Sequence, residues 1–547
     1  MLFPLSPFLF LLLKRGTNAF WCPNLLLACL LFLTAASAET EAAPRDRANI
    51  VMIVADDLGF SDLGAYGGEI STPNLDRLAR EGLRFTQFYN NAVCNVSRLS
   101  MMTGLYPRFG EAGLLRPNMV TVSEVLKQAG YATVLTGKWH LGRDEENRPT
   151  ARGFNEYYGV PSGACNYFDP AMPEAIDGPL GRRPFWHNRE SVDHFPDDFY
   201  TTDAFTRHAV ENIQRLAAGS QPFFVNVCYT APHYPLQARE HDVMRYRGRY
   251  DKGYFELRKS RYRRLVELGL IRSSWELPDA DPKLGSWYYD YEIEPWGEVK
   301  EPEQARRRME VYAAMVESLD RGIGKIIDAL ETSGVRRKTL VLFFSDNGGC
   351  ASLPANTEAY KAYNHGVTLG SKESYEFCGP GWGWAQNAPF RRYKTWLYEG
   401  GIATPFIASW PGIIRPGLLT HDIGHVVDLM PTLLEIAGEQ GPKAFRGRAV
   451  LPLEGKSLMP LLMSQKHPGH EAIFWQLFGN RAVRQDKWKL VWGVTRGQWE
   501  LYDMEADRTE VHDLAGSHRD LVARLSEAWL DWAGRHEVNI NSTEVER

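Results

Sequence analysis

Two pairs of oxygen-bearing side chains directly follow strongly apolar segments of the chain. Asp56 and Asp57 end the first of these segments, and Asp346 and Asn347 end another that lies much further along. All four offer oxygen ligands, which favour Ca²⁺ or Mg²⁺ over zinc. Either pair alone would more often cap a helix or form a turn. Because both pairs follow predicted strands, we interpret them as parts of one divalent cation site.

Basic side chains follow two further apolar segments. Lys138 and His140 come after residues 132–136, and His233 comes after residues 223–229. Lys138 and His140 are two residues apart, so on an extended segment both would face the same side. A lysine and histidines beside a cation suit an anionic substrate and a proton transfer. A salt-bridged lysine with structural histidines is the alternative interpretation.

A cysteine opens a helical segment. Cys94 is followed by helix-compatible residues through Met102, and then by Gly104. Backbone N–H groups and the helix dipole at such a position favour an anion or a thiolate. A small buried core residue is the alternative, because free cysteine is often part of the core.

Alternating strands and helices must position these residues. Amphipathic helices are predicted at 74–80, with Thr72 as N-cap and Pro73 in the first turn, and at 303–332. The pattern predicts an α/β fold with a large, mostly parallel or mixed sheet flanked by helices. The carboxyl ends of parallel strands meet at one edge, so the distant side chains should converge there. Five segments are apolar throughout, as in a sheet covered on both faces: residues 50–55, 132–136, 223–229, 340–345 and 406–409.

The pattern changes near residue 465. Short strands are predicted at 473–477, 487–492 and 499–502, and an amphipathic helix follows at 520–532. This pattern indicates a small antiparallel sheet with one covering helix. We therefore predict a catalytic domain over residues 47–465 and a C-terminal subdomain over residues 466–540.

The sequence of the N-terminus predicts an export signal. Short apolar runs, a basic pair at Lys14 and Arg15, and small residues up to Ala38 predict a signal peptide over residues 1–38. Its removal leaves five cysteines, so at least one stays outside any disulfide. The 547-residue chain carries a net charge of −5, which argues against a nucleic-acid partner. We expect a periplasmic or secreted protein with no stable membrane span after cleavage.

The chain resembles the formylglycine-dependent sulfatases, and bacterial arylsulfatases most of all, over residues 47 to about 535. The family signature, Cys-x-Pro-x-Arg or Cys-x-Ala-x-Arg with a following Thr-Gly, is matched by Cys94, Arg98 and Thr103-Gly104. The resemblance implies an alkaline-phosphatase-like fold. Further matching segments are 56–59, 137–142, 231–233, 345–349 and 394–401.

The resemblance also implies roles for individual residues. Cys94 would be converted to formylglycine by a formylglycine-generating or sulfatase-maturing enzyme. Arg98 and His140 would hold the resulting nucleophile, and Lys138, Lys394 and His233 would bind sulfate, with His233 protonating the leaving oxygen. One cation, Ca²⁺ or alternatively Mg²⁺, would be bound by Asp56, Asp57, residue 94, Asp346 and Asn347.

The sequence also allows two other functions. Val96 stands where the family has proline or alanine, so an unmodified, inactive sulfate- or glycan-binding homologue is one alternative. A phosphate or phosphonate ester hydrolase of the same superfamily is another, because tetrahedral anions are alike. The substrate would be an aryl or carbohydrate sulfate. Trp382, Trp384 and Tyr393 could stack on it, or could pack in the core.

Overall fold

The computed structural model describes residues 47–108, 114–172, 183–285, 287, 289–354 and 357–538. The predicted signal peptide lies outside these residues. Within the described ranges, no helix has both the length and the apolar character needed to cross a bilayer.

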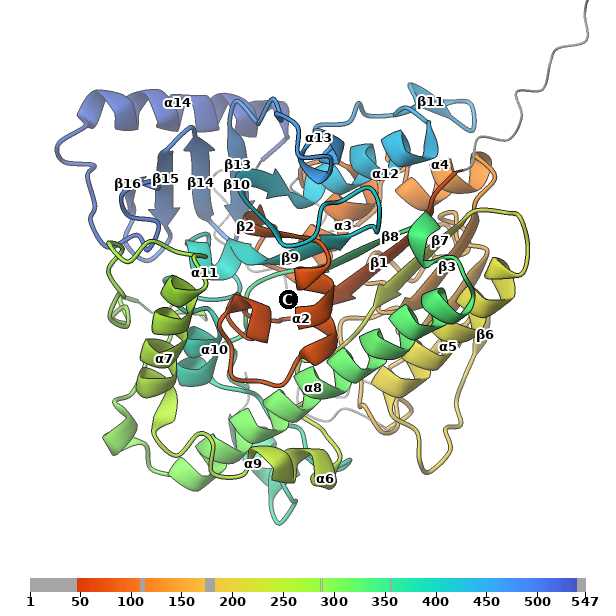
Figure 1. Cartoon of the computed structure of the whole chain (residues 1–547). Coiled ribbons are helices and arrows are strands. Elements are labelled where there is room, and N and C mark those ends of the chain that lie inside the picture. The colour runs from red at the N-terminus through yellow and green to blue at the C-terminus, as the bar shows by residue number, and fades with distance from the viewer. Residues whose placement is uncertain are drawn as a thin grey trace, which may run out of the picture. The chain divides into compact units, whose positions relative to one another are not determined.

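A ten-stranded sheet forms the centre of the fold (Figure 1). Its order is β10-β2-β9-β8-β1-β7-β3-β4-β5-β6. β8, β1, β7, β3 and β4 are mutually parallel, whereas β9 runs antiparallel to both β8 and β2. The expected large mixed sheet is therefore confirmed. The strands are β1 (Asn49–Ala55), β2 (Leu83–Tyr89), β3 (Ala132–Gly137), β4 (Glu156–Gly159), β5 (Trp186–His187), β6 (Glu190–Ser191), β7 (Phe223–Cys228), β8 (Thr339–Ser345), β9 (Ala403–Ser409) and β10 (Leu418–His425).

Helices cover both faces of the sheet, which explains the unbroken apolar strands. Alternate residues of β1 enter different cores: Val51 and Ile53 join one apolar cluster, and Met52 and Val54 join the other. Figure 1 shows α5 and α8 side by side across one face. The first cluster includes residues of α2 (Pro73–Arg80), α5 (Thr201–Ala217) and α8 (Pro302–Thr332), and the second includes residues of α3 (Cys94–Thr103), α4 (Val122–Gln128), α12 (Leu429–Ala437) and α13 (Met459–Leu462).

The remaining elements are short or lie outside the two helical layers. Thr72 is the N-cap residue of α2, as predicted, although its side chain makes no capping hydrogen bond to the backbone of the helix. Its hydroxyl instead accepts from the Gly64 N–H and donates to Asp76. Among the described residues, the remaining helices and strands are α6 (Glu240–Val243), α7 (Gly253–Glu267), α9 (Thr357–Asn364), α10 (Pro380–Gln386), α11 (Glu399–Ile402), β11 (Ala444–Phe445) and β12 (Arg448–Ala449). 3-10 turns lie at Gly64–Tyr66, Met244–Tyr246, Trp296–Glu298, Arg336–Lys338 and Val426–Asp428.

A four-stranded antiparallel sheet follows, as predicted, and α14 (Arg519–Arg535) packs against it. One of its strands, β14, was not predicted, because arginines interrupt its apolar pattern. Arg481 stacks over Trp492 and Trp529, so these charged side chains take part in packing. The strands are β13 (Ile473–Leu477), β14 (Asn480–Gln485), β15 (Trp488–Gly493) and β16 (Gln498–Asp503).

A buried ionic cluster joins this small sheet to the segment that follows Lys394. Lys489 Nζ lies 2.9 Å from Glu399 Oε1 and 2.7 Å from Glu510 Oε1, and all three side chains are fully buried. Arg508 Nε adds a 2.8 Å contact to Glu399 Oε2. Loss of the lysine would leave two buried carboxylates without their main partner.

We therefore expect Lys489→Ala to lower the free energy of unfolding by about 3–5 kcal/mol. Lys487→Ala is the matched control, because Lys487 pairs with Asp503 at 2.7 Å but is 41% exposed. Its loss should cost less than about 1 kcal/mol. Urea unfolding of both variants measures the difference. Equal, small losses would show that the buried cluster contributes little.

Candidate active site

Four neighbouring parallel strands deliver the predicted residues to one edge. β8, β1, β7 and β3 are adjacent, and their carboxyl ends meet there. Beyond these ends stand Asp346 and Asn347, Asp56 and Asp57, His233, and Lys138 with His140. The structure brings all of them together with Cys94, Arg98 and Lys394, as the contacts below show.

The turn after β3 depends on a glycine. Gly137 has φ +99°, and a Cβ placed on it would lie 1.9 Å from the Cys228 carbonyl oxygen. Any other residue would collide with β7 at this point. The tight turn lets Lys138 enter the pocket directly from the strand end.

Three acceptor oxygens in the pocket lack hydrogen-bond donors. Among the described residues, Asp56 Oδ1, Asp57 Oδ2 and Asn347 Oδ1 are buried and accept no hydrogen bond. Ligand atoms of Asp56, Asp57 and His233 lie within 4.8 Å of one another. Unpaired buried oxygens are costly, and a bound cation would satisfy them. The residues present therefore fit a hard divalent ion.

Three buried basic groups pair with the three carboxylates. Lys138 Nζ lies 2.6 Å from Asp56 Oδ2, and Lys394 Nζ lies 2.6 Å from Asp57 Oδ1. Arg98 binds Asp346 Oδ2 through Nε at 2.9 Å and through a terminal nitrogen at 2.8 Å. These charges balance. A divalent ion added to the pocket would make it positive, as an anionic ester requires.

The same surroundings shift the pKa values of the pocket. Burial and the nearby Asp56 raise the pKa of Asp346 to about 6. Although burial opposes it, His233 and Lys394 hold the pKa of Asp57 below its ordinary value. Burial lowers the pKa of His233 to about 4, despite Asp57 and Asp56, so this imidazole is neutral at pH 7 before an ion or substrate binds.

Cys94 is the first residue of α3, as predicted. Its Sγ lies 3.3 Å from His140 Nδ1, and it is not part of a disulfide. Burial raises the pKa of the thiol, although Lys138 and Lys394 pull the other way. Of the expected anion or thiolate, the thiolate is disfavoured, because burial outweighs both lysines.

Lys138 and His140 lie in the same pocket, as predicted, but not because they are on one side of an extended segment. His140 has φ +60°, so the segment is not extended. Trp139 between them is 2% exposed and belongs to the apolar core. The left-handed residue turns the chain back, so that the imidazole reaches Cys94 while Trp139 packs away from the pocket.

Sequence reasoning missed the residues that hold the loop after Asp57. Tyr312 of α8 donates to the Asp57 carbonyl oxygen at 3.3 Å and to Asp62 Oδ2 at 2.7 Å. Arg261 binds Asp62 Oδ1 at 2.6 Å. Tyr312 interrupts an aliphatic helix face, and this was the one sequence signal for such a role.

The three aromatic residues that precede Lys394 belong to the core. Trp382, Trp384 and Tyr393 are 2–3% exposed and lie in the apolar cluster that contains α8. Trp382 donates to the Ala305 carbonyl oxygen at 2.7 Å. The packing interpretation therefore applies to all three.

Comparisons with known proteins agree with this geometry. Residues 48–439 match the family model Sulfatase, and residues 390–531 match the model N-sulphoglucosamine sulphohydrolase, C-terminal. An uncharacterized sulfatase of Schizosaccharomyces pombe is 35% identical over 532 residues, covering 90% of this chain and 94% of that protein. An arylsulfatase of Klebsiella aerogenes is 34% identical over 446 residues, covering 76% and 92%.

A solved structure shares the architecture. The crystal structure of Ps i-CgsB in complex with k-i-k-neocarrahexaose superposes with a TM-score of 0.65 at 25% identity, covering 90% of this chain and 94% of that one. The family model spans most of the chain, and the two relatives exceed 30% identity over nearly their whole length. This chain is therefore a member of the sulfatase family, enzymes that hydrolyse sulfate esters.

Proposed function

We propose that this sulfatase acts through a formylglycine made from Cys94 and a hard divalent cation, Ca²⁺ in the first place. The observation that carries the proposal is the set of three donorless oxygens, on Asp56, Asp57 and Asn347. Asp346 and residue 94 complete the proposed ligands. When present, the hydrated aldehyde supplies an oxygen nucleophile, and the cation polarises the sulfate oxygens.

The chain's own residues would bind and orient the ester. Lys138 and Lys394 hold Asp56 and Asp57 now, and both are placed to bind sulfate oxygens once a cation shares those carboxylates. Arg98, which also donates to the Lys138 carbonyl oxygen at 3.0 Å, fixes the pocket wall. We assign His140, beside Cys94 Sγ, to proton transfer at residue 94.

His233 is the residue that we assign to the leaving oxygen. Its Nε2 lies 3.5 Å from Asp57 Oδ2, and its Nδ1 lies 2.6 Å from the Tyr234 carbonyl oxygen. The carbonyl requires a proton on Nδ1, so Nε2 faces the pocket. A second proton on Nε2, favoured by the two aspartates and by a bound anion, would pass to the departing oxygen.

Sulfated saccharides and aryl sulfates are the substrate classes that we propose. The Klebsiella relative is named an arylsulfatase, and the similar solved structure holds neocarrahexaose. We also propose that the protein is exported and meets a formylglycine-generating or sulfatase-maturing enzyme before it folds. The apolar leader and the burial of Cys94 support this order of events, because a buried thiol is out of an enzyme's reach.

The sulfate and phosphate esters of p-nitrophenol test the proposal. We expect kcat/KM for the sulfate to exceed that for the phosphate by at least about tenfold. The two esters share a leaving group, so the ratio reports recognition of the anion. A dominant phosphatase rate would reverse the assignment in favour of a phosphate or phosphonate ester hydrolase.

Removal of the cation should stop turnover. We expect dialysis against a chelator to lower kcat on the order of 10³-fold, because several kcal/mol of charge stabilisation are lost. Ca²⁺ or Mg²⁺ should restore the rate, and a sample dialysed without chelator is the control. Full turnover by protein that elemental analysis shows to be free of metal would contradict the oxygen-lined site.

A further inference from the structure

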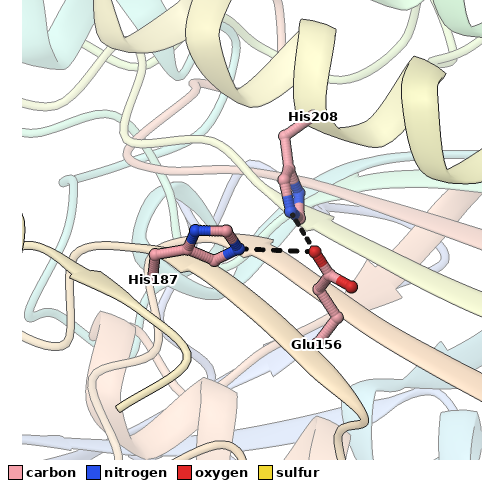
Figure 2. Close-up of side chains that lie close together, drawn as sticks. All are labelled: Glu156, His187 and His208. Carbon is pink, nitrogen blue, oxygen red and sulfur yellow. Dashed lines mark hydrogen bonds and ion pairs between the residues drawn. The ribbon is translucent and has the colours of Figure 1, made fainter. Parts of the chain in front are cut away.

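A second group of side chains of the types that ligate metal ions lies toward the β6 end of the large sheet. Figure 2 shows Glu156, His187 and His208 with their ligand atoms turned toward one another. Glu156 comes from β4, His187 from β5 and His208 from α5. β4 is the third strand from β1 in the sheet order, so the group is separate from the pocket of Asp56 and Asp57.

The distances suit a tetrahedral ion. His187 Nε2 lies 3.4 Å and His208 Nε2 lies 3.3 Å from the same carboxylate oxygen, Glu156 Oε1. Ligand atoms about 2.0–2.1 Å from a tetrahedral zinc ion are about 3.3–3.4 Å from one another. Both nitrogens are thus at this spacing from the carboxylate oxygen, and all three ligand atoms lie within 4.8 Å of one another.

The His208 ring has hydrogen-bond partners that fit the tautomer needed for a metal ligand. Asn212 Oδ1 accepts from Arg215, and Asn212 Nδ2 donates to the His208 carbonyl oxygen at 2.9 Å. The amide is therefore oriented with its NH₂ toward His208 Nε2, 3.3 Å away. When Nε2 accepts this hydrogen bond, the ring proton is on Nδ1, beside Thr136 Oγ1, and Nε2 has the lone pair that a metal ligand needs.

In that tautomer two electron-pair donors face each other at 3.3 Å, His208 Nε2 and an oxygen of Glu156. A proton between them would give an ordinary ion pair. A metal ion at the same place would satisfy both atoms and would also reach His187 Nε2, which lies 3.4 Å from the same oxygen.

Solvent can reach this group of side chains, and neighbouring residues hold it in position. The His187 side chain is 49% exposed and that of His208 is 11% exposed, so one side of the group is open to solvent. The His208 ring stacks on Tyr158 with centroids 5.1 Å apart, which fixes its orientation. Arg215 lies 3.6 Å from the other oxygen, Glu156 Oε2, and leaves Oε1 to the imidazoles.

We propose that Glu156, His187 and His208 form a second metal site that takes Zn²⁺ or a similar transition-metal ion. Two imidazoles and one carboxylate, with a fourth position open to water, are ligands that zinc accepts and that Ca²⁺ and Mg²⁺ do not prefer. Such an ion would fasten the β5–β6 hairpin to α5 and β4. It would stabilise the fold without touching the ester.

Metal titration of the full chain tests the site. Saturating Ca²⁺ keeps the oxygen-lined pocket occupied, and Co²⁺ absorption followed by Zn²⁺ calorimetry reports the second ion. We expect one Zn²⁺ per chain, a visible Co²⁺ band, and a rise in Tm on adding Zn²⁺. His187→Gln and Glu156→Gln should each weaken Zn²⁺ at least about tenfold and abolish the rise in Tm.

The two variants should affect metal binding alone. Both residues are partly exposed, so the substitutions should leave the fold and the hydrolysis of p-nitrophenyl sulfate unchanged. His365→Gln, at an exposed histidine outside the group, is the matched control and should bind Zn²⁺ like the parent. Absence of the Co²⁺ band in the parent, or unchanged Zn²⁺ affinity in both variants, would overturn the proposal.

Discussion

Cys94→Ala is expected to lower kcat for sulfate ester hydrolysis by about 10⁵-fold or more, the order seen when a covalent nucleophile is removed. The substitution deletes one sulfur atom from a site where Sγ contacts His140 at 3.3 Å. It leaves the paired charges of the pocket in place. The measurement is single-turnover and steady-state hydrolysis of p-nitrophenyl sulfate by matched preparations.

Cys165→Ala is the control for this variant. Cys165 is also buried, at 1% exposure, and belongs to the apolar cluster that contains residues of α8. We expect its substitution to keep near-parental turnover. If Cys94→Ala retains more than a small fraction of the parental rate, residue 94 is not the nucleophile, and the ester must be attacked by another group.

His233→Gln should have the second-largest effect, and its size should depend on the leaving group. Loss of a positioned acid typically costs ~10²–10⁴ in rate. The full loss is expected for carbohydrate or alkyl sulfates, whose leaving oxygen must be protonated. p-Nitrophenolate leaves without a proton, so its sulfate should lose much less. Steady-state rates across a series of leaving groups measure this dependence.

The competing role for His233 is metal binding, because its Nε2 lies among the aspartate oxygens. Elemental analysis of His233→Gln distinguishes the two roles. Unchanged metal content with a leaving-group-dependent loss supports the acid, whereas equal losses on all substrates with metal depletion support a ligand. His467→Gln, at a buried histidine that contacts the Ser457 carbonyl oxygen, should keep full activity.

Most of the framework could be predicted from the sequence because its strands are buried on both faces. Continuous apolar runs then have few competing interpretations. β1 and β8 differ from their predicted ranges by one residue at the N-terminal end. β14 was not predicted, because Arg481 and Arg484 pack in it by stacking over aromatic rings. Hydropathy counts such residues as solvent-exposed.

The sequence predicted which residues meet in the pocket, but it could not predict the protonation state of Cys94. Strand ends in a parallel sheet place Asp56, His233 and Asp346 at one edge whatever the loops do. The protonation of Cys94 depends instead on a balance between burial and two lysines that reach it from distant segments. The left-handed turn at His140 likewise follows from local packing of Trp139 and has no pattern of its own.

The division into a catalytic domain ending at residue 465 and a C-terminal subdomain remains a prediction. The four-stranded sheet is present, but Lys489 shares buried contacts with Glu399 of α11. Such a connection means that the two parts depend on each other for stability. The unfolding of Lys489→Ala described above therefore also bears on this boundary.

The mass of the peptide that carries residue 94 shows directly whether Cys94 has been converted to formylglycine. Protein from its native host, digested and measured by mass spectrometry, should show sulfur and two hydrogens of Cys94 replaced by one oxygen, in a fraction that scales with kcat. Val96, which departs from the family's proline or alanine, makes this a demanding test. An unmodified thiol in protein that nevertheless hydrolyses sulfate esters would contradict the account.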